Sequence, residues 1–211
     1  MSTKLHYFDI YGRGEFIRFL LAHAKVEYEN VFVAREQMGD YKAGLAEFGQ
    51  LPVLERNGQR YVQSWSVLRT LGQELGYYPT DAETAYQVDV VIEGVEEFFT
   101  KYFRPAFEQN PERKAALIKE LVEFIPRMSQ LVQSRLEANT SQTHIVGDKR
   151  TIADFALAAV AFNCIENPLS PFKDQIAEVV KEGEFPLVDA YFAQLATELA
   201  DRLSSRGPRP F

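Results

Sequence analysis

The sequence has few of the residues that ordinarily carry thiol or metal chemistry: one cysteine and three histidines among 211 residues. Cys164 has no second cysteine with which to form an intrachain disulfide, which fits a reducing cytosol. It also falls inside a predicted buried helix, where a protein thiol is a poor nucleophile. His6, His23 and His144 lack the spacing of metal ligands and belong to no convincing Ser-His-Asp set. We therefore expect neither a protein-thiol mechanism nor a required metal.

Long apolar runs and basic clusters are also missing. The longest apolar run, residues 155–162, is far too short to span a bilayer, and no basic-then-apolar signal sequence opens the chain. A formal net charge of −7 without a basic cluster argues against nucleic acid as a partner. The Gly12-x-Gly14 pair stops short of a dinucleotide-binding pattern, and no Walker motif occurs. These absences predict a cytoplasmic protein with no membrane or nucleic-acid partner.

The apolar pattern of the first 76 residues predicts a small α/β domain. The expected elements are, in order, a strand over 4–8, a helix after Gly14, a strand over 26–33, irregular helix over 34–47, two strands from residue 53 joined by an Asn57-Gly58 turn, and a helix over 65–75. The resulting order, βαβ–α–ββα, is that of a thioredoxin-like domain.

The remainder of the chain predicts only helices, so the fold class is α/β followed by all-α. Helical patterns cover about 84–108, 112–137, 155–165, 172–182 and 186–202. Pro126 should kink the second of these, and Thr151 with Asp154 has capping-box spacing before the third. The predicted organisation is a domain of residues 1–76, a linker of 77–83 and a helical domain of 84–211.

Residues 48–66 carry features that could hold a small peptide. A cis Leu51-Pro52 bond would turn the chain before the third strand and free the backbone of Leu51 to pair with an extended peptide. Ser64 can cap the following helix, where unpaired N–H groups favour a carboxylate. Each feature alone is common in proteins without such a site, so the inference rests on their arrangement.

This stretch, together with Tyr7 near the end of the first strand, resembles the cytosolic glutathione transferases of the tyrosine type. The resemblance extends over nearly the whole chain and is greatest to the sigma class, which includes haematopoietic prostaglandin D synthase and the S-crystallins. It implies the glutathione transferase fold, a homodimer, and glutathione as co-substrate. It also implies that Pro52 is cis and that Gln63 and Ser64 bind the γ-glutamyl carboxylate.

In that family the tyrosine at the position of Tyr7 donates its hydroxyl to the sulfur of glutathione. A free thiol has a pKa of about 8.5, so only a few per cent is thiolate at neutral pH. Lowering that pKa by about two units needs roughly 2.7 kcal/mol of preferential stabilisation of the anion. One hydrogen bond to a charged group supplies about 1.5–3 kcal/mol. Tyr7 is therefore expected to be catalytic, with the bound thiolate attacking an electrophile directly.

The resemblance assigns further glutathione contacts, one of which has an equally good alternative. Arg13 matches an arginine near the first helix, although an ion pair within the protein would explain it as well. Gln50 stands where sigma-type relatives often have lysine, and Met38 replaces an aromatic residue near Lys42. Glu97 matches an acid that reaches the ligand from the partner subunit. The expected glutathione-binding residues are Tyr7, Arg13, Lys42, Gln50, Leu51, Pro52, Gln63, Ser64, Glu96 and Glu97.

An acidic stripe runs along the first long helix at helical spacing. It consists of Asp89, Glu93, Glu96 and Glu97. Such a stripe is usually a solvated face, whereas related prostaglandin synthases hold a divalent cation between two of them. Both interpretations are open from the sequence.

The second substrate is expected between the two domains, against apolar side chains that are equally plain candidates for the core. These residues are Phe8, Ile10, Tyr11, Phe99, Tyr102 and Phe103. Arg104 stands where prostaglandin D synthase has a tryptophan. Residues 208–211 could close this pocket, but we expect them to form a loose tail.

The predicted function is conjugation of glutathione to small hydrophobic electrophiles, or reduction of organic hydroperoxides with it, in detoxification. One alternative is a glutathione-dependent isomerase of the prostaglandin type. Others are a protein of the same fold that packs without catalysis, as most S-crystallins do, and a carrier of hydrophobic ligands. Retention of Tyr7 together with Gln63 and Ser64 favours an enzyme. The electrophile stays unnamed, because apolar side chains in such a cleft are interchangeable.

Overall fold

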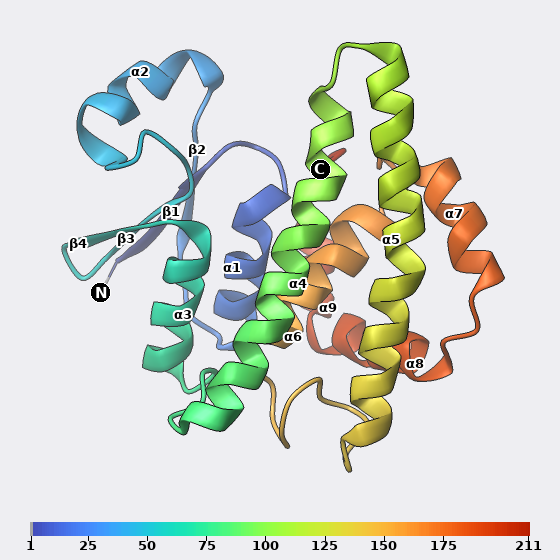
Figure 1. Cartoon of the computed structure of the whole chain (residues 1–211). Coiled ribbons are helices and arrows are strands. Elements are labelled where there is room, and N and C mark those ends of the chain that lie inside the picture. Colours follow the sequence, from blue (N-terminus) through green and yellow to red (C-terminus); the bar gives the residue numbers. More distant parts are fainter. Residues whose placement is uncertain (1) are drawn as a thin grey trace.

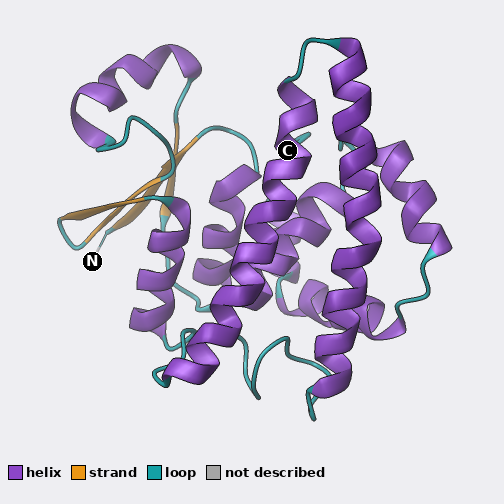
Figure 2. Cartoon of the chain, viewed as in Figure 1, coloured by secondary structure: helices purple, strands orange, loops and turns teal. Residues whose placement is uncertain are grey.

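The computed structural model describes residues 2–211, which form a small mixed α/β part and a larger helical part (Figure 1, Figure 2). A four-stranded sheet of order β2-β1-β3-β4 lies in the first part. Its strands are β1 (Thr3–Tyr7), β2 (Glu29–Phe32), β3 (Val53–Arg56) and β4 (Gln59–Val62). β2 is parallel to β1, whereas β3 is antiparallel to both β1 and β4. This mixed sheet confirms the predicted thioredoxin-like fold.

Two helices separate the sheet from the helical part. α1 (Gly12–His23) and α3 (Ser64–Leu75) lie between the sheet and the long helices (Figure 1). Leu5 pairs with Leu54 in the register of β1 and β3, and both side chains are fully buried. α3 ends where Gly76 adopts a left-handed conformation with φ of 82°, which glycine adopts without steric cost. The central strands and these helices together form the core of the first part.

Residues 35–45 form short helical turns, as their weak periodicity predicted. The turns are η1 (Arg35–Gln37), α2 (Met38–Asp40) and η2 (Tyr41–Leu45). None of the side chains described in these turns is fully buried, and the segment projects to one side of the sheet (Figure 1). It therefore adds little to the core and leaves Met38 and Lys42 available to a ligand.

The second part is helical throughout. Its elements are α4 (Ala82–Phe107), α5 (Pro111–Ala138), α6 (Ile152–Val160), η3 (Ala161–Ile165), α7 (Lys173–Glu182), α8 (Pro186–Glu198) and α9 (Ala200–Ser205). α4 and α5 are long neighbours that lie side by side (Figure 1). The single helix expected over 186–202 was wrong, because Leu199 leaves the helical conformation and divides it into α8 and α9. Within residues 2–211, none of the helices has both the length and the apolar character that crossing a membrane requires.

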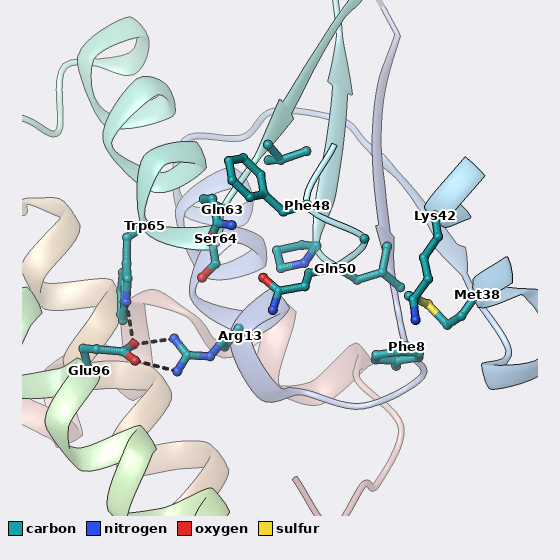
Figure 3. Close-up of a pocket in the computed structure, with 14 residues that line it drawn as sticks. Phe8, Arg13, Met38, Lys42, Phe48, Gln50, Gln63, Ser64, Trp65 and Glu96 are labelled. Atoms are coloured by element: carbon teal, nitrogen blue, oxygen red, sulfur yellow. Dashed lines mark hydrogen bonds and ion pairs between the residues drawn. The ribbon is translucent and has the colours of Figure 1, made fainter. Parts of the chain in front are cut away.

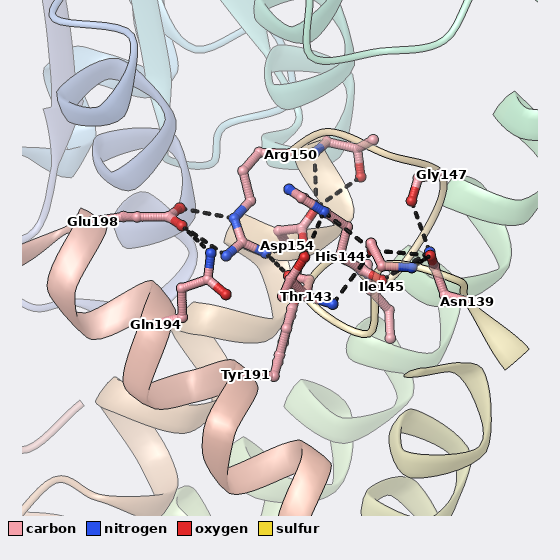
Figure 4. A network of polar contacts seen from close by, with 12 residues as sticks. Asn139, Thr143, His144, Ile145, Gly147, Arg150, Asp154, Tyr191, Gln194 and Glu198 are labelled. Atoms are coloured by element: carbon pink, nitrogen blue, oxygen red, sulfur yellow. Dashed lines mark hydrogen bonds and ion pairs between the residues drawn. The ribbon is translucent and has the colours of Figure 1, made fainter. Parts of the chain in front are cut away.

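A buried polar network fixes the start of α6 (Figure 4). The backbone N–H of Thr151 donates to the Asp154 carboxylate at 2.7 Å, which confirms the capping box. Asp154 also accepts hydrogen bonds from Arg150 at 3.1 Å and from the Tyr191 hydroxyl at 2.9 Å. Arg150 in turn reaches Glu198 at 2.8 Å. The fully buried carboxylate of Asp154 thus joins the N-terminus of α6 to α8.

The C-terminal segment is held against the loop between β1 and α1, so the expectation of a loose tail was wrong. The Tyr11 hydroxyl donates to the carbonyl of Gly207 at 2.8 Å. Arg209 donates to the Asp9 carboxylate at 2.7 Å. The ring of Phe211 contacts those of Phe103 and Phe107 on α4, and the C-terminus is marked beside that helix in Figure 1. Each of these contacts joins residues far apart in the sequence, which local patterns do not predict.

Candidate active site

A cleft of about 610 Å³ lies beside the loop that precedes β3 (Figure 3). Its other boundaries are the residues that follow β1, the start of α3 and the middle of α4. Its walls are formed by Phe8, Arg13, Met38, Lys42, Phe48, Gly49, Gln50, Leu51, Pro52, Val62, Gln63, Ser64, Trp65 and Glu96. Eight of the residues expected to bind glutathione belong to this wall. The two that do not are Tyr7, which lies behind the wall, and Glu97, which points to solvent.

The loop before β3 presents free backbone groups to the cleft. The Leu51-Pro52 bond is cis, as expected, and the pairing of β3 with β1 begins only at Val53. Neither the N–H nor the C=O of Leu51 is hydrogen-bonded to any of residues 2–211. An extended peptide in the cleft could therefore pair with Leu51 as a short additional strand.

The start of α3 presents a helix N-terminus to the same cleft. Gln63 precedes the helix with φ of 65°, a left-handed conformation that costs free energy in a residue other than glycine. Ser64 is the first helical residue rather than the cap we expected, and no side chain caps α3. The free N–H groups of the first turn and the positive end of the helix dipole favour a bound carboxylate here.

The hydroxyl of Tyr7 is held by the first turn of α1. The backbone N–H of Arg13 donates to the Tyr7 oxygen at 2.9 Å. A Cβ atom at Gly12 would lie 2.6 Å from the Tyr7 hydroxyl, and one at Gly14 would lie 2.7 Å from its ring. Both glycines are therefore needed for the close approach of α1 to the tyrosine. The Gly12-x-Gly14 pair thus has a role beside the tyrosine.

The environment of Tyr7 keeps its hydroxyl protonated. The side chain is 6% exposed, and this burial raises the pKa of Tyr7 above its ordinary value, against the opposing effect of the Arg13 N–H. Because the oxygen already accepts a hydrogen bond, the phenolic proton is available for donation. The guanidinium of Arg18 lies 5.7 Å from the Tyr7 ring on its other side. An anionic acceptor beside Tyr7 would thus gain a charge-assisted hydrogen bond.

Arg13 forms an ion pair within the chain, which is the alternative that the sequence left open (Figure 3). Both of its Nη atoms donate to the Glu96 carboxylate, one of them at 2.7 Å. The indole N–H of Trp65 donates to the same carboxylate at 2.7 Å, and its ring stacks on Phe16. Burial raises the pKa of Glu96, but the hydrogen bonds from Arg13 and Trp65 outweigh it and lower that pKa. The pair links α1 to α4 at the edge of the cleft.

The cleft wall includes residues that the sequence did not single out, among them Trp65, which binds Glu96 and stacks on Phe16. The signal was present, because this only tryptophan directly follows Gln63 and Ser64. Phe48 and Val62 also line the cleft. Their apolar side chains are typical of loops and strands in general, so nothing in the sequence distinguished them.

The residues expected to contact a second substrate lie in different parts of the structure. Phe8 lines the cleft, and Phe103 is partly buried against the core. Phe99 and Tyr102 are fully buried, and the Tyr102 hydroxyl pairs with Ser170 at 2.8 Å. Their assignment to the substrate site was wrong, because this face of α4 packs against the rest of the helical core. They are the core residues that the sequence equally allowed.

Ile10 and Tyr11 also lie away from the cleft. They line a separate cavity between the β1–α1 loop and the C-terminal segment. The Tyr11 ring is turned toward that segment, where the Arg206 guanidinium lies 4.2 Å from it. Ile10 and Tyr11 thus do not share a cavity with Phe8, and their contact with a second substrate stays a prediction.

The acidic stripe of α4 is largely paired with basic side chains. Arg69 lies 2.8 Å from Asp89 and 3.4 Å from Glu93. Glu97 is 57% exposed, and its nearest cation is Lys101 at 3.6 Å. In the part of the chain that the structure describes, no three histidine, cysteine, aspartate or glutamate side chains are grouped to hold a metal.

Two family models match the chain: the N-terminal domain of glutathione S-transferases over residues 3–69 and the C-terminal domain over residues 96–199. Glutathione S-transferase P of Caenorhabditis elegans is 32% identical over 158 residues, which cover 74% of each chain. The chain belongs to the glutathione S-transferase family. Glutathione S-transferase A2 of Homo sapiens is 31% identical over 167 residues, covering 76% of this chain and 73% of that one. The expected enzyme family is thereby confirmed.

Solved structures of glutathione S-transferases share the complete fold. A nu-class enzyme from Haemonchus contortus has a TM-score of 0.80 and 27% identity, over 100% of this chain and 99% of that one. Monomeric Na-GST-3 from Necator americanus has a TM-score of 0.83 and 25% identity, over 100% of both chains. Prostaglandin synthase D of Nilaparvata lugens has a TM-score of 0.80 and 21% identity, over 98% and 99% of the two chains, and shows the fold alone. The predicted glutathione S-transferase fold is confirmed.

Proposed function

We propose that this glutathione S-transferase conjugates glutathione to small hydrophobic electrophiles, with Tyr7 as its catalytic residue. The observation that carries the proposal is the protonated Tyr7 hydroxyl, held by the Arg13 N–H at 2.9 Å beside the cleft. The cleft also offers the free backbone of Leu51 and the uncapped start of α3. A small peptide with a terminal carboxylate and an anionic sulfur would use all three features.

The proposed orientation of glutathione follows from the chemistry of each wall. The γ-glutamyl carboxylate binds at Gln63 and Ser64, where α3 begins. The cysteinyl unit pairs with the backbone of Leu51, next to Pro52. At the other end of the cleft, Lys42 binds the glycyl carboxylate and Gln50 donates a hydrogen bond to the peptide. This orientation directs the cysteinyl sulfur toward Tyr7.

Acidic groups would complete the site on the γ-glutamyl side. Glu96 lies on the cleft wall with its carboxylate held by Arg13. In the proposed homodimer, Glu97 of the partner subunit reaches the amino group of the ligand. Its exposure in the single chain supports this assignment, because an exposed carboxylate is available to a second subunit.

The chemical step needs no bond to the protein. The thiol of bound glutathione releases its proton to water, and the Tyr7 hydroxyl donates a hydrogen bond to the thiolate. The sulfur electron pair then forms a bond to the electrophilic carbon, and for an aryl halide the halide leaves with its bonding electrons. A single charged hydrogen bond of about 1.5–3 kcal/mol lowers the thiol pKa by about 1–2 units. Phe8 offers the electrophile an apolar surface beside this sulfur.

The same thiolate supports two related reactions. Reduction of an organic hydroperoxide by two glutathione molecules gives an alcohol, water and glutathione disulfide. An isomerase of the prostaglandin type would instead turn over an endoperoxide without consuming glutathione. The conjugation reaction is preferred because it requires only the nucleophile and an apolar surface, both of which the cleft offers.

We further propose a sigma-like, cytoplasmic homodimer with domains of residues 1–76 and 84–211 joined by residues 77–83. The two family models fall on either side of this linker, which supports the division. Sedimentation equilibrium tests the assembly directly. A dimer mass agrees with the proposal, whereas a monomer mass would align the protein with the monomeric hookworm enzyme and remove Glu97 from the site.

The decisive test is the thiolate absorbance of bound glutathione as a function of pH, in the wild type and in Tyr7→Phe. We expect the bound thiol to ionise about 1–2 pH units below the free thiol in the wild type and close to it in the variant. Conjugation of an aryl halide should fall in parallel while glutathione binding is kept. If the thiol pKa is unshifted in both proteins although glutathione binds, the protein is a binder of the same fold and the catalytic assignment to Tyr7 is wrong.

A further inference from the structure

A second cavity of about 320 Å³ lies on the other side of the β1–α1 loop from the cleft. It is enclosed by that loop, β2, α9 and the C-terminal segment. Four arginines line it: Arg18 from α1, Arg202 from α9, and Arg206 and Arg209 from the segment that follows. Such a concentration of guanidinium groups is unusual in a chain with a formal net charge of −7.

Two carboxylates within residues 2–211 pair with these four arginines. Glu15, which is fully buried, lies 2.9 Å from Arg18, 2.8 Å from Arg202 and 3.7 Å from Arg206. Asp9 pairs with Arg209 at 2.7 Å. The group therefore carries an excess of two positive charges, and buried charge that is not balanced is costly. Burial and the neighbouring Arg202 lower the pKa of Arg206 despite the opposing effect of Glu15.

Two guanidinium groups also keep buried donors without an acceptor. Arg18 is 2% exposed; its Nε donates to Asn30 at 2.7 Å and its Nη1 to Glu15 and to the Ile10 carbonyl. Its Nη2 has no hydrogen-bond partner in residues 2–211, and neither has the Nε of Arg202. Buried donors of this kind are nearly always satisfied in folded proteins. Both atoms have almost no accessible surface, and Oε1 of the neighbouring Glu15 also lacks a hydrogen-bond partner in the described part of the chain, so these donors lie behind the surface of the cavity that Arg18 and Arg202 line.

We propose that this cavity is a binding site for a phosphate group, separate from the glutathione cleft. A phosphate dianion would balance the two excess charges, and its oxygens would accept from the guanidinium groups that reach the cavity, since arginine matches phosphate geometry especially well. The Ser205 hydroxyl, also on the cavity wall, offers a further donor. The space exceeds what one phosphate fills, and the 55% exposed ring of Phe32 forms part of the wall. The site can thus take either free phosphate or the phosphate of a small organic molecule.

Two substitutions can block the site without removing an arginine. Ser205→Glu places a carboxylate on an exposed position of the wall, and Asn30→Asp places one beside the Nε of Arg18 with almost no change of shape. Ser204→Glu is the matched control, because it adds the same charge one residue earlier on α9, at an exposed position outside the cavity. Thermal unfolding of each variant verifies that it is folded, and either blocking variant suffices for the test.

The experiment is calorimetric titration of the full chain with inorganic phosphate, with chloride exchanged to keep the ionic strength constant. It is performed with S-hexylglutathione saturating the cleft and also without it, so that phosphate in the glutathione site is recognised. We expect saturable binding with one phosphate per chain under both conditions. Binding should weaken by about tenfold or more in Ser205→Glu and Asn30→Asp, since like charges within a few ångströms repel strongly in a partly buried site. It should stay within about twofold of the wild type in Ser204→Glu.

Phenyl phosphate distinguishes the two sources of the phosphate group. Tighter binding of phenyl phosphate than of inorganic phosphate identifies a small phosphorylated molecule whose apolar part contacts Phe32, and equal binding identifies free phosphate. Absence of saturable binding in the wild type, loss of binding when S-hexylglutathione is present, or equal weakening in Ser204→Glu and Ser205→Glu would each overturn the proposal. None of these outcomes depends on whether Tyr7 activates glutathione.

Discussion

Gly14→Ala should inactivate the enzyme while leaving it folded. In an ordinary helix this substitution stabilises by about 1 kcal/mol. In α1, the new Cβ would lie 2.7 Å from Cδ1 of Tyr7, well inside the 3.4 Å at which ordinary contact begins. The tyrosine ring has to retreat by about 0.7 Å, and its hydroxyl, at the far end of the ring, moves by about 1 Å. A misplacement of this size costs about 100-fold in rate where catalysis depends on one group's position.

The expected effect on stability is small by comparison. Overpacking a filled site costs about 1–3 kcal/mol, and the gain in helix propensity offsets about 1 kcal/mol of this. The net loss of at most about 2 kcal/mol lowers the midpoint of thermal unfolding by less than about 8 °C for a chain of this length. Activity and stability should therefore separate clearly, which would not happen if the variant were merely unstable.

Gly94→Ala in α4 is the matched control, because a Cβ there meets nothing within 4 Å. It should raise the thermal midpoint by about 2–4 °C and leave conjugation unchanged. Both variants are assayed for aryl-halide conjugation and for the pKa of bound glutathione. If Gly14→Ala retains wild-type kcat and a lowered thiol pKa, then the position of the Tyr7 hydroxyl does not limit catalysis and the reasoning is refuted.

Two further predictions concern buried and half-buried carboxylates. Glu96→Gln should cost only about 0.5–1 kcal/mol, because its pair with Arg13 is about one-third exposed, and the fluorescence of Trp65 should shift. The pKa of Glu96 is lowered in the folded protein, so the ionised carboxylate stabilises the fold above about pH 4.5, and this stabilisation is lost as the pH falls through the lower pKa of the folded state. The urea midpoints of the wild type and Glu96→Gln should therefore converge in acid. A difference between the two midpoints that does not change with pH would contradict this. Asp154→Ala leaves the Tyr191 hydroxyl and the Thr151 N–H without their acceptor and removes one of the two carboxylates that bind Arg150. It should cost about 3–5 kcal/mol in urea unfolding, whereas a loss below about 1 kcal/mol would show that the network is not what fixes α6.

Local patterns predicted the elements well because each one is encoded by neighbouring residues. The capping box at Thr151 and Asp154, the left-handed end of α3 at Gly76 and the irregular turns of 35–45 all depend on a few consecutive residues. Five of the expected residues of the cleft wall were likewise concentrated in one stretch, from Gln50 to Ser64, and Tyr7 lies behind that wall. The sequence pattern alone did not show that this stretch and Tyr7 lie close together in space. The resemblance to a family implied that they do.

The predictions of the second-substrate residues were less accurate, because an apolar side chain can pack either against a ligand or against the protein core. Helical spacing showed that Phe99 and Tyr102 share a buried face of α4 but not whether that face meets a ligand or another helix. Tyr11 follows Phe8 by three residues, yet it lines a different cavity. The role of Trp65 depends on Glu96, which lies 31 residues later on α4, so its neighbours Gln63 and Ser64 did not reveal that contact. Each of these outcomes is decided by tertiary packing rather than by local sequence.

The contact of the C-terminal segment with the β1–α1 loop has a consequence for the order of assembly. Asp9 meets Arg209 across 200 positions, and Tyr11 meets Gly207 across 196. Contacts between residues so far apart in the sequence form late, because closing a long loop costs more conformational entropy than forming a local helix or hairpin. A newly made chain would then have its sheet and most of its helices before the C-terminal segment fixes the loop that follows Tyr7. Activity should therefore appear later during refolding than helical circular dichroism does.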